Sequence, residues 1–249
     1  MIRRSSIAML ARASLAFVFV NTPTAAAMAE NAAGMKVRAA QTWTVSQAPQ
    51  GAWDVYLTAE RLAPGFWTGP HTHPGPEYAL IIKGEIQQWD HGTRHEVKTG
   101  DGYFIPANVV HEVGDTSPNQ AFLVSTHLIP RGQAFSAPLR LQQAPAGAPK
   151  RAPGHTRLRQ RKFQLSQHPS TPPFRLTEQV VDLPGEVRFS PEPDAATRLV
   201  VIMAGTVIVA KSGRSYDVGQ SYTVPANASG TVITGKMPAS LMVTAIEGK

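Results

Sequence analysis

One pattern occurs twice in this chain, and it constrains the fold more than any other sequence feature. In each half an apolar run ends in a glycine, at residues 78–84 and again at 199–205. Each run leads through a glycine-containing turn to a Gly-x5-Pro-Ala-Asn segment, at residues 100–108 and 219–227. An internal repeat of this kind indicates two structurally similar units.

The two units are expected to be all-β. A chain of 249 residues accommodates two compact domains and a tail, because domains commonly hold about 100–150 residues. Charged residues make up only 16% of the chain, and 21 prolines and 20 glycines favour short strands joined by tight turns. The repeat places the units at residues 40–136 and 174–249.

The segment between the units, residues 137–173, is rich in proline, glutamine, alanine and basic residues, which is typical of a linker. Residues 156–165 alternate enough to add a strand to one unit. The net charge of +7 arises locally, since residues 131–175 hold nine Lys or Arg and no acidic residue. The remainder sums to −2, so we expect no nucleic-acid binding.

The N-terminus has the order of a secretory signal peptide. Arg3 and Arg4 precede a mostly apolar stretch, residues 7–20, which is too short to span a bilayer. The small residues at 27–29 then supply a cleavage site before Glu30. The sequence therefore predicts that residues 1–29 are a signal peptide, that the mature protein has no membrane span, and that it is periplasmic or secreted.

Histidines and a glutamate in the first unit have a spacing that suits a metal ion. His71 and His73 lie two apart, so on a strand they point to the same face. A Pro-Gly-Pro turn leads to Glu77, and His111 follows in the second motif. With no cysteine in the chain, the ligands of such a site must be nitrogen and oxygen atoms. His127 is left open between cavity and core, with a packing role favoured.

At these positions the chain resembles the cupin superfamily. The first family motif is matched by Gly65, His71, His73, Glu77 and Gly84, and the second by Gly100, Pro106 and His111. Asn108 stands for a family glycine, a substitution that left-handed backbone tolerates in asparagine. The resemblance covers about residues 40–130 and, less clearly, 174–247. It implies two small antiparallel jelly-roll barrels, each with one ligand cavity, joined by the proline-rich and basic linker.

The resemblance also implies one divalent transition metal ion, Fe, Mn, Ni, Cu or Zn, on His71, His73, Glu77 and His111. In the second unit Arg198 occupies the glutamate position, and the carboxylates of Glu192 and Asp194 replace the imidazole pair. Arginine keeps its proton and repels a cation, so these residues are expected to pair with one another. We therefore predict a degenerate second cupin and one ion per chain.

The apolar runs at 78–84 and 199–205 carry hydrophobic residues on both faces, so something must cover the outer face. The candidates are the other barrel of the same chain and a second copy in a homodimer. For function, the resemblance implies an oxidoreductase of the quercetin-dioxygenase-like or oxalate-degrading kind, with Glu77 as the catalytic base and a small organic molecule as substrate. The alternative is a non-catalytic module that binds or senses a small ligand or a sugar acid.

Overall fold

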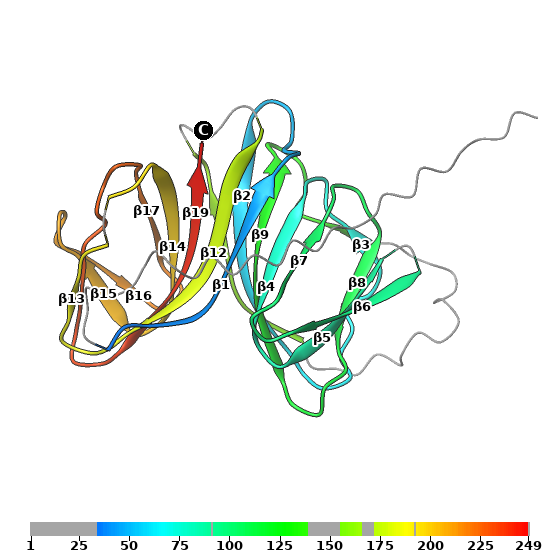
Figure 1. Cartoon of the computed structure of the whole chain (residues 1–249), viewed down its shortest axis with the longest axis horizontal. Coiled ribbons are helices and arrows are strands. Elements are labelled where there is room, and N and C mark those ends of the chain that lie inside the picture. Colours follow the sequence, from blue (N-terminus) through cyan, green and yellow to red (C-terminus); the bar gives the residue numbers. More distant parts are fainter. Residues whose placement is uncertain (1–33, 91, 139–154, 166–171, 192, 249) are drawn as a thin grey trace, which may run out of the picture.

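The computed structural model describes residues 34–90, 92–138, 155–165, 172–191 and 193–248. Within these ranges the chain forms antiparallel sheets and no α-helix, and the sheets build two barrels side by side (Figure 1). The predicted all-β fold with two jelly-roll barrels is confirmed. No helix in the described residues is long and apolar enough to cross a membrane. The predicted signal peptide, residues 1–29, lies outside them.

The first barrel consists of two five-stranded sheets. The sheet that faces the second barrel has the order β11-β2-β9-β4-β7, formed by His155–Phe163, Trp53–Leu62, Ala121–Pro130, Glu77–Lys83 and Gly102–Ile105. The outer sheet has the order β10-β3-β8-β5-β6, formed by Ala137–Pro138, His71–Thr72, His111–Asp115, Glu85–Asp90 and Thr93–Lys98.

The second barrel repeats this plan with a smaller outer sheet. Its inner sheet has the order β1-β12-β19-β14-β17, formed by Lys36–Val45, Phe174–Leu183, Ala239–Glu247, Ala196–Ala204 and Ser221–Val224. Its outer sheet has the order β13-β18-β15-β16, formed by Arg188–Phe189, Val232–Thr234, Thr206–Val209 and Arg214–Asp217.

Two strands complete the barrel of the opposite half of the chain. β1 pairs with β12 from Lys36–Asp182 to Val45–Phe174, so it belongs to the second barrel although residues 40–45 were expected in the first (Figure 1). β11 lies inside the expected linker and pairs with β2 of the first barrel. The strand predicted at 156–165 is thus confirmed, and each barrel contains one strand from outside its own repeat.

The two inner sheets pack against each other over one apolar core that contains side chains from both halves. Tyr78, Leu80 and Ile82 of β4 face this shared core, while Ala79 and Ile81 face the interior of the first barrel. β14 divides its residues between the shared core and the second barrel in the same way. The runs that are apolar on both faces are therefore covered by the other barrel of the same chain.

The repeated turns have the backbone geometry that their residues indicated. Gly84 and Gly205 both have positive φ, and a Cβ atom on Gly205 would lie 2.2 Å from the carbonyl oxygen of Pro238. A side chain at this position is therefore excluded by contact as well as by conformation. Asn108 and Asn227 both have φ of 62°, which confirms that Asn108 adopts left-handed geometry in place of the family glycine.

One carboxylic acid is buried in the shared core. Leu176, Glu178 and Val180 follow one another on the same face of β12, and Glu178 is 0% exposed. Its carboxyl oxygens make no hydrogen bond of ordinary geometry, and the Thr126 hydroxyl is the polar group that stabilises them most. Burial disfavours the ionised form and raises the pKa of Glu178 well above its ordinary value of 4.5. In the folded chain Glu178 therefore keeps its proton at pH values above 4.5 at which a free glutamic acid has lost it.

This burial predicts a stability that falls with rising pH. Above pH 4.5 the unfolded chain releases the Glu178 proton and the folded chain keeps it. Folding therefore becomes less favourable as pH rises from 4.5 towards the raised pKa of Glu178 in the folded chain. Glu178→Gln removes this dependence. The difference in unfolding free energy between the variant and the unmodified chain should grow by about 1.4 kcal/mol per pH unit. Denaturant titrations at a series of pH values measure it.

The matched control is Glu96→Gln, which changes an exposed carboxylate of β6. Its difference from the unmodified chain should stay level over the same pH range. If the Glu178→Gln difference is equally level, then the folded chain does not keep a proton on Glu178.

Candidate metal site

The predicted ligands converge on the interior of the first barrel from three strands. His71 lies on β3, His73 follows that strand, Glu77 begins β4 and His111 begins β8. β3 and β8 are neighbours, with His71 and His111 in direct register. The turn at 74–76 lies against β9, where a Cβ atom on Gly75 would be only 1.7 Å from the carbonyl oxygen of Leu128. Glycine therefore allows the close turn that brings Glu77 beneath the two imidazoles.

Backbone carbonyl groups fix the orientation of the three predicted imidazole ligands. Each Nδ1 donates a hydrogen bond to a carbonyl oxygen: His71 to Gly69 at 2.8 Å, His73 to Phe135 at 2.7 Å and His111 to Val109 at 2.9 Å. The proton is then on Nδ1, so each Nε2 carries the lone pair. Hydrogen bonds of this kind set the tautomer of histidines that ligate metals.

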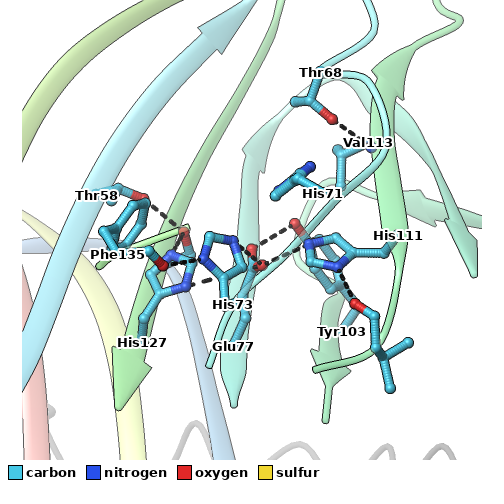
Figure 2. A network of polar contacts seen from close by, with 12 residues as sticks. Thr58, Thr68, His71, His73, Glu77, Tyr103, His111, Val113, His127 and Phe135 are labelled. Carbon is cyan, nitrogen blue, oxygen red and sulfur yellow. Dashed lines mark hydrogen bonds and ion pairs between the residues drawn. The ribbon is translucent and has the colours of Figure 1, made fainter. Parts of the chain in front are cut away.

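Glu77 is the central anion of the cavity (Figure 2). Its Oε2 lies 3.3 Å from Nε2 of His111 and 3.5 Å from Nε2 of His73, while its Oε1 accepts a hydrogen bond from the Tyr103 hydroxyl at 3.1 Å. Burial alone would raise the pKa of Glu77, but the surrounding imidazoles hold it below its usual value. Glu77 is therefore ionised across the ordinary pH range.

A fourth imidazole, that of His127, lies in the same cavity. His127 is on β9, directly opposite Glu77 in the register with β4, and is 2% exposed. Its Nδ1 lies 4.0 Å from Oε2 of Glu77. The sequence favoured a packing role for this residue, and the structure instead places it beside Glu77. The signal that would have found it is the pairing of β9 with β4, which local spacing does not contain.

Trp67 lies in the core and not in the cavity wall. It precedes His71 by four residues, so on one strand both side chains would point to the same face, which is compatible with either place. The ring is 2% exposed and packs on Gly114, where a Cβ atom would lie 2.3 Å from it. Trp67 is not among the residues that line the cavity, so it fills the core.

The cavity has a volume of about 290 Å³, and its lining contains both polar and apolar side chains. Leu62, Phe66, Val113, Leu123 and Phe135 supply the apolar lining. Besides the imidazoles and Glu77, it contains an ion pair between Glu60 of β2 and Arg157 of β11, at 2.8 Å. Because the Arg157 side chain is 41% exposed, this pair lies at the solvent side. The segment expected to be a linker therefore supplies a cavity residue.

The donor atoms fit a divalent transition ion. Nε2 of His111 and Nδ1 of His127 are buried and have no hydrogen-bond partner. One ligand atom from each of His71, His73 and His111 lies within 4.8 Å of the others, and the same holds for His73, Glu77 and His127. Imidazole nitrogen combined with one carboxylate is a donor set typical of Mn, Fe, Ni, Cu and Zn sites. These residues can therefore hold the predicted ion.

The second barrel has the predicted arginine in place of a ligand. Arg198 is 4% exposed, and its Nη2 lies 2.7 Å from Oδ2 of Asp194, so this predicted pair is confirmed. Glu192, the other expected partner, lies outside the described residues. The backbone N–H of Asn227 donates to the backbone carbonyl oxygen of Asp194 at 2.6 Å. In the first barrel the backbone N–H of Asn108 donates to the backbone carbonyl oxygen of His73 at 2.7 Å in the same way. Asp194 therefore occupies the position equivalent to His73.

Comparison with known proteins supports the fold. Residues 59–127 match the family described as Cupin domain, which corresponds to the first barrel from β2 to β9. The vicilin of hazelnut, Corylus avellana, has a similar structure at a TM-score of 0.52 and 12% identity, over 82% of this chain and 85% of that one. No curated protein matches the sequence significantly.

Two further structures are more distant. AerE from Microcystis aeruginosa has a TM-score of 0.48 at 13% identity, over 84% of this chain and 98% of its own. The oxalate decarboxylase of Bacillus subtilis, whose description names Mn(II) centres, has a TM-score of 0.41 at 14% identity, over 82% and 76%. Identities this low concern the fold, so the function has to be argued from the cavity.

The site predicts the metal stoichiometry of the chain. Elemental analysis of the purified chain should approach one divalent ion per molecule, because the potential donor groups found in the described residues all lie in the first barrel. His71→Ala or His111→Ala should remove most of the metal. His95→Ala deletes an imidazole of β6 outside the cavity and should leave the content unchanged. Two equivalents, or full metal content after both cavity changes, would place the site elsewhere.

The site also predicts how metal affinity depends on pH. Burial lowers the pKa of His71 to about 4, whereas Glu77 raises the pKa of His111 above its usual 6.5 despite burial. Binding an ion must therefore displace one proton from His111 first, and one from His71 only below about pH 4. The dissociation constant should rise by about tenfold per pH unit below the His111 transition and more steeply below about pH 4.

Chelator competition at a series of pH values measures this profile. A dependence that already corresponds to two protons near pH 6 would contradict it, because His71 would then titrate like a free imidazole.

Proposed function

We propose that this chain is an exported metal-dependent oxidoreductase, dioxygenase-like or oxalate-degrading, that acts on a small organic molecule in the cavity of the first barrel. The observation that supports this most is the convergence of buried imidazole nitrogens and one ionised carboxylate at a cavity that still has about 290 Å³ of free volume. An ion that only stabilises the fold would not need a cavity of this size beside it. A divalent ion bound there supplies Lewis-acid and redox chemistry at a position with room for a ligand.

The cavity residues orient the reactants and exclude water. Phe135 packs its ring against His73 and His127, with ring centroids 4.8 and 4.7 Å apart, and its carbonyl oxygen holds His73. β10 follows Phe135 and pairs with β3, where Pro138 lies opposite His71. This pairing holds the segment around Phe135 in place. This segment therefore closes the cavity beside the imidazoles, and the apolar part of the lining favours the carbon skeleton of a small molecule.

We assign to Glu77 the roles of ligand and proton acceptor. The imidazoles that lower its pKa also make it a weak base. Accepting a proton therefore requires Glu77 to move away from His111 and His73. Glu60, the other carboxylate of the cavity, forms an ion pair with Arg157 at the solvent side.

The proposal predicts turnover with consumption of oxygen for a dioxygenase, or carbon dioxide release for an oxalate-degrading enzyme. The purified chain is loaded in turn with Fe(II), Mn(II), Ni(II), Cu(II) or Zn(II) and presented with flavonols, oxalate and small diketones. Oxygen uptake and gas release are recorded. At least one combination should react, and His111→Ala loaded in the same way should lose the activity because it loses the metal.

The competing function is a binding or sensing module. Ligand-dependent thermal stabilisation of the metal-loaded chain, with no oxygen uptake and no gas release for any member of the panel, would support that module and contradict the oxidoreductase.

A further inference from the structure

His127 is more than a wall of the cavity, because its one free nitrogen points at the proposed ligands. It lies on the opposite side of His73 and Glu77 from His111 (Figure 2). The ring is 2% exposed, and its centroid lies 4.5 Å from that of His73. Its Nδ1 is buried without a hydrogen-bond partner, although a carboxylate lies in front of it. A buried polar atom of this kind needs a partner.

A short chain of hydroxyl groups holds the ring in place. Nε2 of His127 lies 3.2 Å from Oγ of Ser125, which lies 2.6 Å from Oγ1 of Thr58. A neutral imidazole carries one proton, on either of its two ring nitrogens. With that proton on Nε2, donated to Ser125, Nδ1 presents a lone pair to Glu77. Two acceptors then face each other across a gap that contains no donor.

The width of this gap is informative. Nδ1 of His127 and Oε2 of Glu77 are 4.0 Å apart, too far for a hydrogen bond. Metal–nitrogen and metal–oxygen bonds are each about 2.0–2.2 Å, so one ion between the two atoms would contact both. A cation there would satisfy the free nitrogen and remove the repulsion between the acceptors.

We propose that His127 is a further metal ligand, which binds through Nδ1, and that His73, Glu77 and His127 hold the ion from the side opposite His71 and His111. This inference rests on the proposed metal site and extends it from four donor residues to five. It differs from the motif in the atom used, because the three other imidazoles present Nε2.

The two groups of donors serve one ion and not two. Both contain His73, whose Nδ1 is engaged by the carbonyl oxygen of Phe135, so His73 has a single nitrogen to offer. An ion held by all five residues keeps one of six octahedral positions for an external ligand. If fewer than five of these residues bind the ion, two or more positions stay free for an external ligand. The number of protein ligands therefore determines whether a substrate can bind the ion through one atom or through two.

The test uses Zn²⁺ and the unmodified chain with ¹⁵N-labelled histidine. Long-range ¹H–¹⁵N correlation spectra report which ring nitrogen carries the proton and which binds metal. In the Zn²⁺-loaded chain, His127 should carry its proton on Nε2 and the metal on Nδ1, with the reverse arrangement at His73 and His111. A proton on Nδ1 of His127, or an Nδ1 unaffected by Zn²⁺, would overturn the inference.

A variant gives an independent measurement. His127→Leu should weaken Zn²⁺ binding by at least about tenfold in chelator competition, and His95→Leu should leave it unchanged. Equal affinities for His127→Leu and the unmodified chain would overturn the inference while leaving the four-residue site intact. Failure of the unmodified chain to bind Zn²⁺ would instead remove the proposed function itself, so the two failures are distinguishable.

Discussion

The face-to-face packing of the two inner sheets is the interaction on which the rest of the structure depends. β4 is apolar on both sides and needs two cores, one inside the first barrel and one between the barrels. The same strand begins with Glu77, so the packing that buries β4 also fixes the central carboxylate of the cavity. On β9 the alternation is equally strict: Thr126 reaches across to Thr244 at 3.0 Å, and His127 faces the cavity. The side chains of β4 and β9 that face the cavity are therefore placed by the packing of their neighbours between the two barrels.

The cavity is organised by backbone atoms more than by side chains. Three imidazoles are oriented by carbonyl oxygens from three separate segments, which include the one that follows β9. A carbonyl group costs no side-chain entropy to position, so the ring orientation exists before any ion binds. The second barrel has the same turn, in which the backbone N–H of Asn227 donates to the carbonyl oxygen of Asp194, and Arg198 lies at the position equivalent to Glu77. The two barrels therefore share this turn although the side chains around it differ.

Much of this could be predicted from the sequence, because the informative signals are local. The spacing of His71, His73 and Glu77 follows from strand parity and one turn, and the repeat indicates two barrels. Contacts set by pairing between distant strands were not accessible. His127 meets Glu77 only through the register of β9 with β4, and Arg157 reaches the cavity only because β11 pairs with β2. Alternation indicates that a strand exists and which side is apolar, but not its neighbour.

The exchange of β1 and β11 between the halves has a consequence for how the chain reaches this structure. β1 is made first and finds its partner only when β12 has been made, and Lys36 pairs with Asp182 far along the chain. Contacts so distant in sequence slow folding, because a long loop must close before any of them forms. Neither barrel is complete without a strand from beyond its own repeat. The two repeats should therefore assemble in a single late step, and a nascent chain that is cut between them should yield two fragments with open sheet edges in place of two folded domains.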